Sequence, residues 1–214
     1  MLENSSPWKH SMEKTKYIFI GAGGHARVLA SVIESNQDEL VAVFDTDLEK
    51  RSLDGVKNEG EYKHDKHPNA EIIIAIGDNV IRERISQEIK HTLGKAIHSA
   101  AVVDRLVNLA EGVQIIQGAI VNRGTSIGKH TIVNTNATVD HDCEIGDFVH
   151  IAPGATLCGG VKVGKGTLIG ANATILPNCE IGADVSVGAG AVVTTDLPDN
   201  VVVVGVPAKI IKHA

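Results

Sequence analysis

Aliphatic residues recur at every sixth position through the second half of the chain, and this spacing is the strongest pattern in the sequence. From Val103 to Val193 each sixth position is Val, Leu or Ile, sixteen residues in unbroken register. The position four places after each of the first fifteen, from Val107 to Ala191, is small or β-branched. A helix repeats every 3.6 residues and a strand every 2, so a period of six fits neither and indicates a solenoid.

The six-residue units predict a parallel β-helix of triangular cross-section. Each unit forms one short side, its aliphatic residue points inward, and the small residue fills the space near the corner. Fifteen units from Val103 to Val192 make five coils, so residues eighteen apart stack on one another. Cys143 and Cys179 fall on the small inward positions, where packing explains them better than chemistry.

The first hundred residues alternate apolar strands with amphipathic segments. We expect strands over residues 16–20, 40–44 and 71–76, and helices over 27–35 and 79–93. This alternation is typical of an α/β fold with a mostly parallel, Rossmann-like sheet. The predicted organisation is a disordered extension or tag at 1–15, an α/β domain at 16–100, a β-helix at 101–195 and a C-terminal segment at 196–214.

Composition and charge narrow the classes of ligand. Hydrophobic residues make up 43% of the chain and aromatic residues 3%, so the core must be aliphatic. The net charge of -6 gives no reason to expect nucleic acid or an anionic membrane as a partner. The three cysteines form no CxxC pair, which favours a reducing compartment. The sequence also has no long apolar run and no signal peptide, so we expect a cytoplasmic protein without membrane insertion.

A glycine-rich turn in the α/β half is the first candidate binding site. Gly21–Ala26 satisfies G-x-G-x-x-[GA] between a strand and a helix, and Asp45 ends the next strand. Such a turn lets phosphates approach a helix N-terminus, and the acid can reach a ribose hydroxyl. Gly77 closes the third strand at the same edge. The alternative is a tight turn that needs glycine for its geometry alone, and about eighty residues supply only half of a dinucleotide-binding fold.

The most polar unit of the solenoid, residues 139–144, is the candidate catalytic site. His141 occupies an outward position, and Gly159, eighteen residues later, leaves a notch beside the imidazole. An imidazole suits a general base at neutral pH, whereas the alternative is a solvated surface histidine. Carbonic anhydrases on this solenoid need three histidines around zinc, and His141 and His150 supply neither the third ligand nor the spacing, so no metal site is expected.

Four segments together resemble a known family: residues 21–25 (GAGGH), 75–79 (AIGDN), 140–150 (DHDCEIGDFVH) and 205–209 (GVPAK). The chain from Lys16 onward is similar to bacterial hexapeptide-repeat acyltransferases with an N-terminal nucleotide-sugar domain. Bacillosamine-type and perosamine-type N-acetyltransferases and sialic acid O-acetyltransferases belong to this family. The resemblance implies a left-handed parallel β-helix and a homotrimer with active sites between subunits.

The resemblance also implies roles for single residues. His141 matches the catalytic base, and Asp142 matches an acidic residue that raises its basicity, although bacillosamine-type enzymes have Glu at this position. Neighbouring residues on a strand face opposite sides, so Asp142 can orient His141 only if the backbone turns there. The matches to acetyl-CoA contacts are His150, Gly159, Ala171 and Ala189. The matches to nucleotide-sugar contacts are Gly23, Gly24, His25, Asp45 and Gly77.

These observations predict an acetyl-CoA-dependent N-acetyltransferase of a nucleotide-linked 4-amino-4,6-dideoxy sugar. The sugar nitrogen attacks the thioester directly, and a backbone N–H, at Gly159, stabilises the oxyanion. O-acetylation of sialic acid or a related sugar is the alternative reaction. A non-catalytic trimeric scaffold that binds a sugar nucleotide is the alternative of another class, and a nicotinamide-dependent oxidoreductase is less favoured still.

Overall fold

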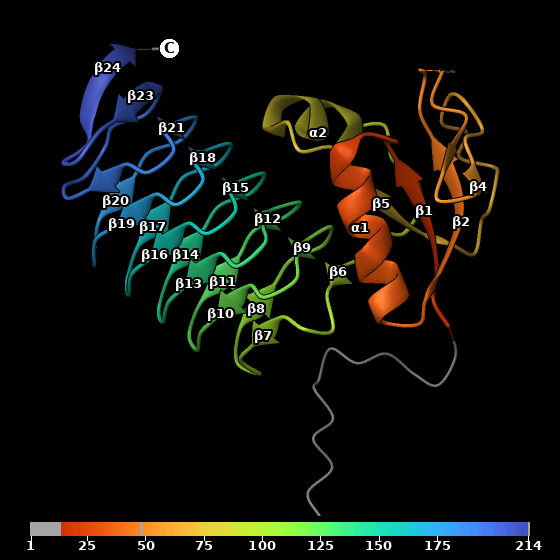
Figure 1. Cartoon of the computed structure of the whole chain (residues 1–214), viewed down its shortest axis with the longest axis horizontal. Coiled ribbons are helices and arrows are strands. Elements are labelled where there is room, and N and C mark those ends of the chain that lie inside the picture. Colours follow the sequence, from red (N-terminus) through yellow and green to blue (C-terminus); the bar gives the residue numbers. More distant parts are fainter. Residues whose placement is uncertain (1–13, 48, 214) are drawn as a thin grey trace, which may run out of the picture.

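The computed structural model describes residues 14–47 and 49–213. Most of the predicted extension, residues 1–13, lies outside this range. Figure 1 shows an α/β unit, here called the N-terminal lobe (residues 14–95), beside a stack of short strands, here called the solenoid (residues 96–213). The predicted fold class, an α/β domain followed by a parallel β-helix, is confirmed.

The N-terminal lobe contains a three-stranded parallel sheet in the order β2-β1-β5. Helix α1 packs on this sheet through Ala26, Leu29, Val32 and Ile33, and Figure 1 shows it on the side that faces the solenoid. The elements are β1 (Lys16–Ile20), α1 (Gly24–Ser35), β2 (Glu39–Phe44), β3 (Ser52–Leu53), β4 (Val56–Lys57), β5 (Glu71–Ile74) and α2 (Asn79–Ser86). The carboxyl ends of the parallel strands meet at one edge, where the glycine-rich turn begins.

Helix α2 differs from its predicted form. It begins at Asn79 but ends at Ser86 instead of residue 93. Beyond Ser86 the chain continues in turns, with Ile89 N donating to Ser86 O at 3.4 Å. The isoleucines at 81, 85 and 89 repeat every four residues and predict one apolar face, but Ile81 is 39% exposed, whereas Arg82 is completely buried. Ile85 and the following Ile89 still pack against the core of the lobe, so α2 is held by these isoleucines on one side and by Arg82 against the solenoid on the other.

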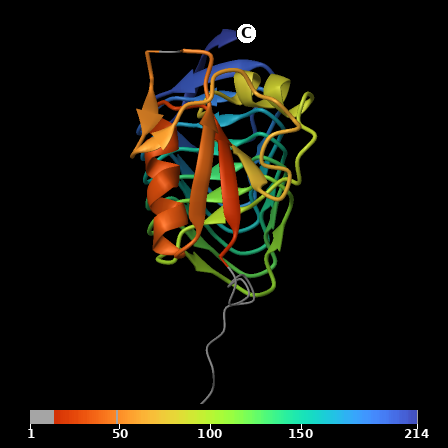
Figure 2. The same cartoon turned by 90° about the vertical axis from the view of Figure 1, so that its right-hand side faces the viewer.

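The solenoid consists of three sheets whose strands run parallel through the coils, with paired residues eighteen apart, such as Val121 and Val139. The last two strands differ, since Val202 pairs with Ser186 and the strand at 209–213 runs antiparallel to its neighbour. The lobe-side sheet contains β6 (Ala96–Ile97), β9 (Gln114–Ile115), β12 (Ile132–Val133), β15 (His150–Ile151), β18 (Leu168–Ile169), β21 (Ser186–Val187), β23 (Val201–Val204) and β24 (Lys209–His213). A second sheet, here called the neutral sheet because its outward side chains carry no charge, contains β7 (Val102–Val103), β10 (Ile120–Val121), β13 (Thr138–Val139), β16 (Thr156–Leu157), β19 (Thr174–Ile175) and β22 (Val192–Val193). The third sheet, here called the charged sheet because Glu144, Lys162 and Glu180 lie on its outer face, contains β8 (Asn108–Leu109), β11 (Ser126–Ile127), β14 (Glu144–Ile145), β17 (Lys162–Val163) and β20 (Glu180–Ile181). Figure 2, viewed from the lobe, shows the coils stacked behind it.

The core of the solenoid is the ladder of sixth-position residues. From Leu109 to Val193 each of these aliphatic side chains is at most 5% exposed. Each is worth about 1.5–3 kcal/mol when buried, so the ladder contributes strongly to the stability of the solenoid. Cys143 and Cys179 are also buried, as expected from their inward positions.

The corners of the solenoid repeat a left-handed backbone conformation every six residues. Gly, Asn or Asp occupies these positions, as at Gly118, Asn136 and Asp142, because they tolerate positive φ best. His130 (φ 53°) and Phe148 (φ 57°) are exceptions. Their rings stack with centroids 5.1 Å apart, and both backbone carbonyls accept hydrogen bonds from Arg82 of α2. The two exceptions therefore mark the place where the lobe docks.

The inward ladder predicts unequal effects at adjacent positions of β14. Ile145→Ala removes a buried side chain and leaves a cavity, so we expect a loss of about 2–5 kcal/mol of unfolding free energy. Glu144→Ala changes an exposed residue on the same strand and should cost less than about 0.5 kcal/mol. Thermal unfolding followed by circular dichroism measures both variants. Equal losses would contradict the inward-outward assignment.

The buried His130 should make the unfolding free energy depend on pH. Burial first, and then the Arg82 charge, lowers the pKa of His130 to about 4, and no hydrogen-bond partner reaches its buried Nδ1 among the described residues. The unfolded chain takes up this proton near pH 6.5, so the unfolding free energy should fall as the pH drops from about 6.5 toward 4. His130→Asn should flatten the fall of the melting temperature between pH 7 and 5. The exposed His64→Asn is the control, and equal slopes in the two variants would refute this role.

Candidate active site

His141 lies at the corner between the neutral and charged sheets, on the outer surface. Its side chain is 61% exposed, and its Nδ1 lies 2.9 Å from Asp142 Oδ2. A Cβ atom on Gly159 would lie only 2.6 Å from Cε1 and Nε2 of the ring. The imidazole therefore covers Gly159, and any other residue at this position would displace it.

The pairing of His141 with Asp142 depends on the corner conformation. Asp142 has φ 57°, a turn that brings the side chains of two adjacent residues to the same side. The hydrogen bond to Asp142, reinforced by the charge of Asp140, raises the pKa of His141. A carboxylate only accepts, so Nδ1 carries the proton and Nε2 keeps a lone pair for a proton from substrate.

His150 lies on the lobe-side sheet, against the end of β5. Its Nδ1 is 3.1 Å from Gly77 O, and its Nε2 is 3.0 Å from Asn134 Nδ2. Because a carbonyl only accepts, Nδ1 carries the proton and Nε2 accepts from the Asn134 amide. Burial, followed by the charges of Arg82 and His25, lowers the pKa of His150 to about 4, so the ring is neutral at pH 7.

His25 joins the glycine-rich turn to the solenoid. Its Nε2 lies 2.7 Å from Gln114 Oε1, while Gln114 Nε2 donates to Ile74 O at 2.9 Å. The second bond fixes the Gln114 amide, so His25 must donate from Nε2. The rings of His25 and His150 lie 6.4 Å apart between centroids. Residues His25, Gly77 and His150 thus meet where the lobe contacts the solenoid.

The start of α1 is open and uncapped. A Cβ atom on Gly23 or Gly24 would meet nothing within 4 Å, and no side chain caps the helix. The backbone N–H groups of a first helical turn attract anions. Asp45 closes the turn, since its carboxylate accepts from Ala22 N at 2.8 Å and from Lys50 Nζ at 3.2 Å.

Asp45 remains a carboxylate despite its partial burial. Burial alone would raise its pKa, but hydrogen bonds from the backbone of Asp47 and Ala22 and from Lys50 outweigh burial and lower the pKa of Asp45. Most of its acceptor capacity is already used within the lobe. Its place beside the glycine-rich turn nevertheless leaves it at the edge where a ribose would lie.

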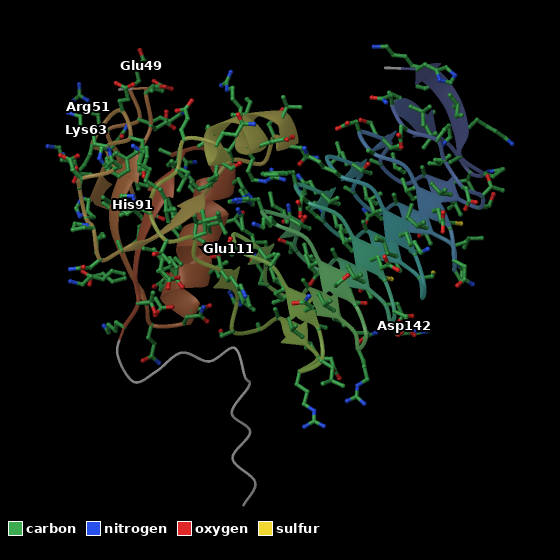
Figure 3. All side chains as sticks on the ribbon, turned by 180° about the vertical axis from the view of Figure 1, so that it is seen from behind. Glu49, Arg51, Lys63, His91, Glu111 and Asp142 are labelled. Atoms are coloured by element: carbon green, nitrogen blue, oxygen red, sulfur yellow. The ribbon has the colours of Figure 1, made fainter. Side chains whose placement is uncertain are left out.

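One chain does not bring all the candidate residues together. His141, Asp142 and Gly159 occupy one corner, whereas His25, Gly77 and His150 lie at the junction with the lobe. Figure 3 shows the labelled Asp142 at an edge of the solenoid directed away from the lobe. Ala171 and the exposed Ala189 follow strands of the lobe-side sheet, and Gly190 N donates to Ala171 O at 2.8 Å, so they stack at another corner.

Three polar residues at the junction escaped the sequence analysis: Arg82, Gln114 and Asn134. Nothing local distinguishes Gln114 or Asn134 from other outward residues of the repeat. Arg82 lies in a helix whose apolar face is formed by isoleucines, and nothing in that pattern indicates that a charged residue beside them is also buried. The signal that could have located the junction was the occurrence of His130 and Phe148 at corners that elsewhere hold Gly, Asn or Asp.

The described residues offer no metal site and no membrane-spanning helix beside this arrangement. Within residues 14–47 and 49–213, no three His, Cys, Asp or Glu side chains are grouped to hold a metal ion. In the same residues no helix has the length and apolarity needed to cross a bilayer. A shallow cavity of about 690 Å³ lies on the charged sheet, lined by Glu144, Lys162 and Glu180 among others, and none of the candidate residues lines it.

Family models match both halves of the chain. The model of the PglD N-terminal domain matches residues 16–89. The model of the bacterial transferase hexapeptide, with six repeats, matches residues 124–159 and 160–195. No curated protein sequence gives a significant match.

Several solved structures match nearly the whole chain. A variant of perosamine N-acetyltransferase from Caulobacter crescentus, in complex with CoA and GDP-perosamine, is 37% identical with a TM-score of 0.89, covering 94% of this chain and 98% of that one. The acetyltransferase domain of PglB from Neisseria gonorrhoeae FA1090, in complex with acetyl coenzyme A, is 32% identical with a TM-score of 0.85, covering 93% and 100%. WeeI from Acinetobacter baumannii AYE is 28% identical with a TM-score of 0.80, covering 93% and 100%. The chain therefore belongs to the hexapeptide-repeat acetyltransferases with a PglD-type N-terminal domain, and it is an acetyltransferase.

Proposed function

We propose that this acetyltransferase uses acetyl-CoA to acetylate the amino group of a nucleotide-linked 4-amino-4,6-dideoxy sugar. The observation that carries the proposal is the exposed His141, held by Asp142 with its Nε2 free to accept a proton. Relatives solved with CoA and GDP-perosamine or with acetyl coenzyme A support the two substrate classes. A non-catalytic scaffold is set aside because the chain belongs to a family of acetyltransferases.

In the proposed reaction the acetyl group passes directly from sulfur to nitrogen. His141 Nε2 removes a proton from the sugar ammonium, and the freed lone pair attacks the thioester carbonyl carbon. The tetrahedral intermediate collapses with cleavage of the C–S bond, the nitrogen passes its second proton to the departing CoA thiolate, and His141 releases the first proton to solvent. The backbone N–H of Gly159, under the imidazole, stabilises the oxyanion, an effect worth about 3 kcal/mol.

The nucleotide sugar is placed on the N-terminal lobe in this proposal. Its diphosphate lies at the uncapped start of α1, where Gly23 and Gly24 leave room for it. Asp45 faces the ribose, and His25 and Gly77 line the path toward the solenoid. Sialic acid O-acetylation, which would use the same base on a hydroxyl, is less favoured because matched relatives carry N-acetyltransferase names.

A homotrimer with sites between subunits completes the proposal. The outward residues of the neutral sheet carry no charge: Val102, Ile120, Thr138, Thr156, Thr174 and Val192. Packing three such sheets around a threefold axis would place the His141 corner of one subunit beside the Ala171–Ala189 corner of the next. Acetyl-CoA then lies between these corners, with His150 and Gly159 at its acetyl end. A cytoplasmic location, where acetyl-CoA is available, belongs to the same proposal.

Removal of the base tests the mechanism. His141→Ala should lower kcat about 100-fold or more while leaving the melting temperature unchanged, because the side chain is exposed. Asp142→Asn should lower the pKa of His141 and shift the acidic limb of the kcat/KM profile to lower pH. Acetyl-CoA turnover is measured with UDP-, dTDP- and GDP-linked 4-amino sugars and with free and CMP-linked sialic acid. A fully active His141→Ala enzyme would end the proposal.

Mixing two inactive variants tests where the sites lie. His141→Ala removes the base, and Gly24→Glu places a carboxylate where the diphosphate is expected. If each site combines the corner of one subunit with the lobe of its neighbour, random mixed trimers made by unfolding and refolding should regain about a quarter of the wild-type activity. If each site lies within one chain, every site keeps one substitution and no activity returns. Each variant refolded alone is the control.

A further inference from the structure

Arg82 is completely buried between the lobe and the solenoid, and its guanidinium has five N–H donors. The hydrogen bonds run from Nε to His130 O (2.8 Å), from Nη1 to Ile76 O (3.0 Å) and Gly77 O (3.1 Å), and from Nη2 to Asn79 Oδ1 (2.8 Å) and Phe148 O (3.1 Å). The acceptors thus come from the end of β5, from α2 and from two stacked corners of the solenoid.

These partners are neutral, and none is a carboxylate. Burying a charged guanidinium among neutral acceptors costs several kcal/mol of desolvation, and apolar side chains would dock a helix at lower cost. Burial lowers the pKa of Arg82 to about 10, so the group remains charged at pH 7. Besides docking α2, Arg82 fixes the direction of each carbonyl group that it binds.

Gly77 O connects Arg82 to His150. This oxygen accepts from Arg82 Nη1 at 3.1 Å and from His150 Nδ1 at 3.1 Å, which uses both of its lone pairs. Because Arg82 also binds Ile76 O, it fixes two successive peptide groups at the end of β5. The direction of the Gly77 carbonyl determines which ring nitrogen of His150 carries the proton.

We propose that Arg82 is a positioning residue for acetyl transfer: it holds the Gly77 carbonyl and so keeps His150 neutral, with its proton on Nδ1. His150 Nε2 then remains an acceptor, which orients the Asn134 amide. The charge of Arg82 acts in the same direction because a nearby cation opposes protonation of the ring. This inference rests on the proposed function, since it treats His150 as part of the active site.

The test combines steady-state kinetics with nitrogen-15 NMR of labelled histidines on the full chain. His150 is assigned from the signals lost in His150→Asn, and its two nitrogen shifts report the tautomer directly. Arg82→Lys keeps the charge but cannot reproduce the planar set of donors, and Arg82→Gln removes the charge. Glu83→Gln is the matched control, because Glu83 binds Lys165 across the same junction without contacting Gly77.

We expect an Nδ1-protonated His150 in the wild type and in Glu83→Gln, and a mixture of tautomers or a charged ring in both Arg82 variants. In the Arg82 variants kcat should fall about tenfold or more, with a smaller change in KM for the nucleotide sugar. The proposal would be overturned if His150 in the wild type were charged or protonated on Nε2. An unchanged tautomer or an unchanged kcat in the Arg82 variants would also overturn it, as would loss of the fold in Arg82→Lys. Absence of turnover in the wild type would refute the proposed function instead, while the NMR comparison would still decide whether Arg82 controls His150.

Discussion

The ladder of buried aliphatic side chains, repeated every six residues, is the constraint on which the rest of the structure depends. Burying Val, Leu or Ile at each sixth position fixes the direction of every other residue in the unit. Since coils stack at eighteen-residue spacing, the ladder also determines which residues lie above one another. His141 lies over Gly159 for this reason, and its position needs no separate loop ordering. A histidine held by a rigid scaffold loses little entropy when substrate binds.

The candidate catalytic pair, His141 and Asp142, depends on the left-handed backbone conformation at a corner of the solenoid rather than on a strand. On a flat strand His141 and Asp142 would face opposite sides, and no ion pair could form. The left-handed conformation at Asp142 removes this obstacle, and an aspartate adopts it at low cost. At His130 and Phe148 the same conformation is less favourable. There the stacked rings and the carbonyls that bind Arg82 offset the strain.

The sequence predicted features that arise from local repetition and not those that arise from distant contacts. The period of six identified the solenoid, its inward residues and the outward corner of His141, because every unit repeats the same information. The predicted end of α2 at residue 93 was wrong. The burial of Arg82 was missed because Arg82 binds the carbonyls of His130 and Phe148, which are distant in the chain. The partners of His25 and His150 were missed for the same reason, since Gln114 and Asn134 become significant only once the lobe lies against the solenoid.

In the proposed trimer, the His141 corner and the nucleotide-sugar site on the lobe belong to different subunits. The contact between each lobe and its own solenoid must therefore hold the lobe in a fixed orientation. In that trimer the lobe of one subunit would present the sugar nucleotide to a base on its neighbour, so a tilt of the lobe on its own solenoid would displace the acceptor from His141. Apolar packing tolerates small sliding movements, whereas hydrogen bonds restrict both distance and direction. The bonds of Arg82 to two solenoid corners and to the end of β5, together with the Gln114 bonds to His25 and Ile74, restrict that tilt. The polar junction therefore provides the rigidity that the proposed intersubunit site would require.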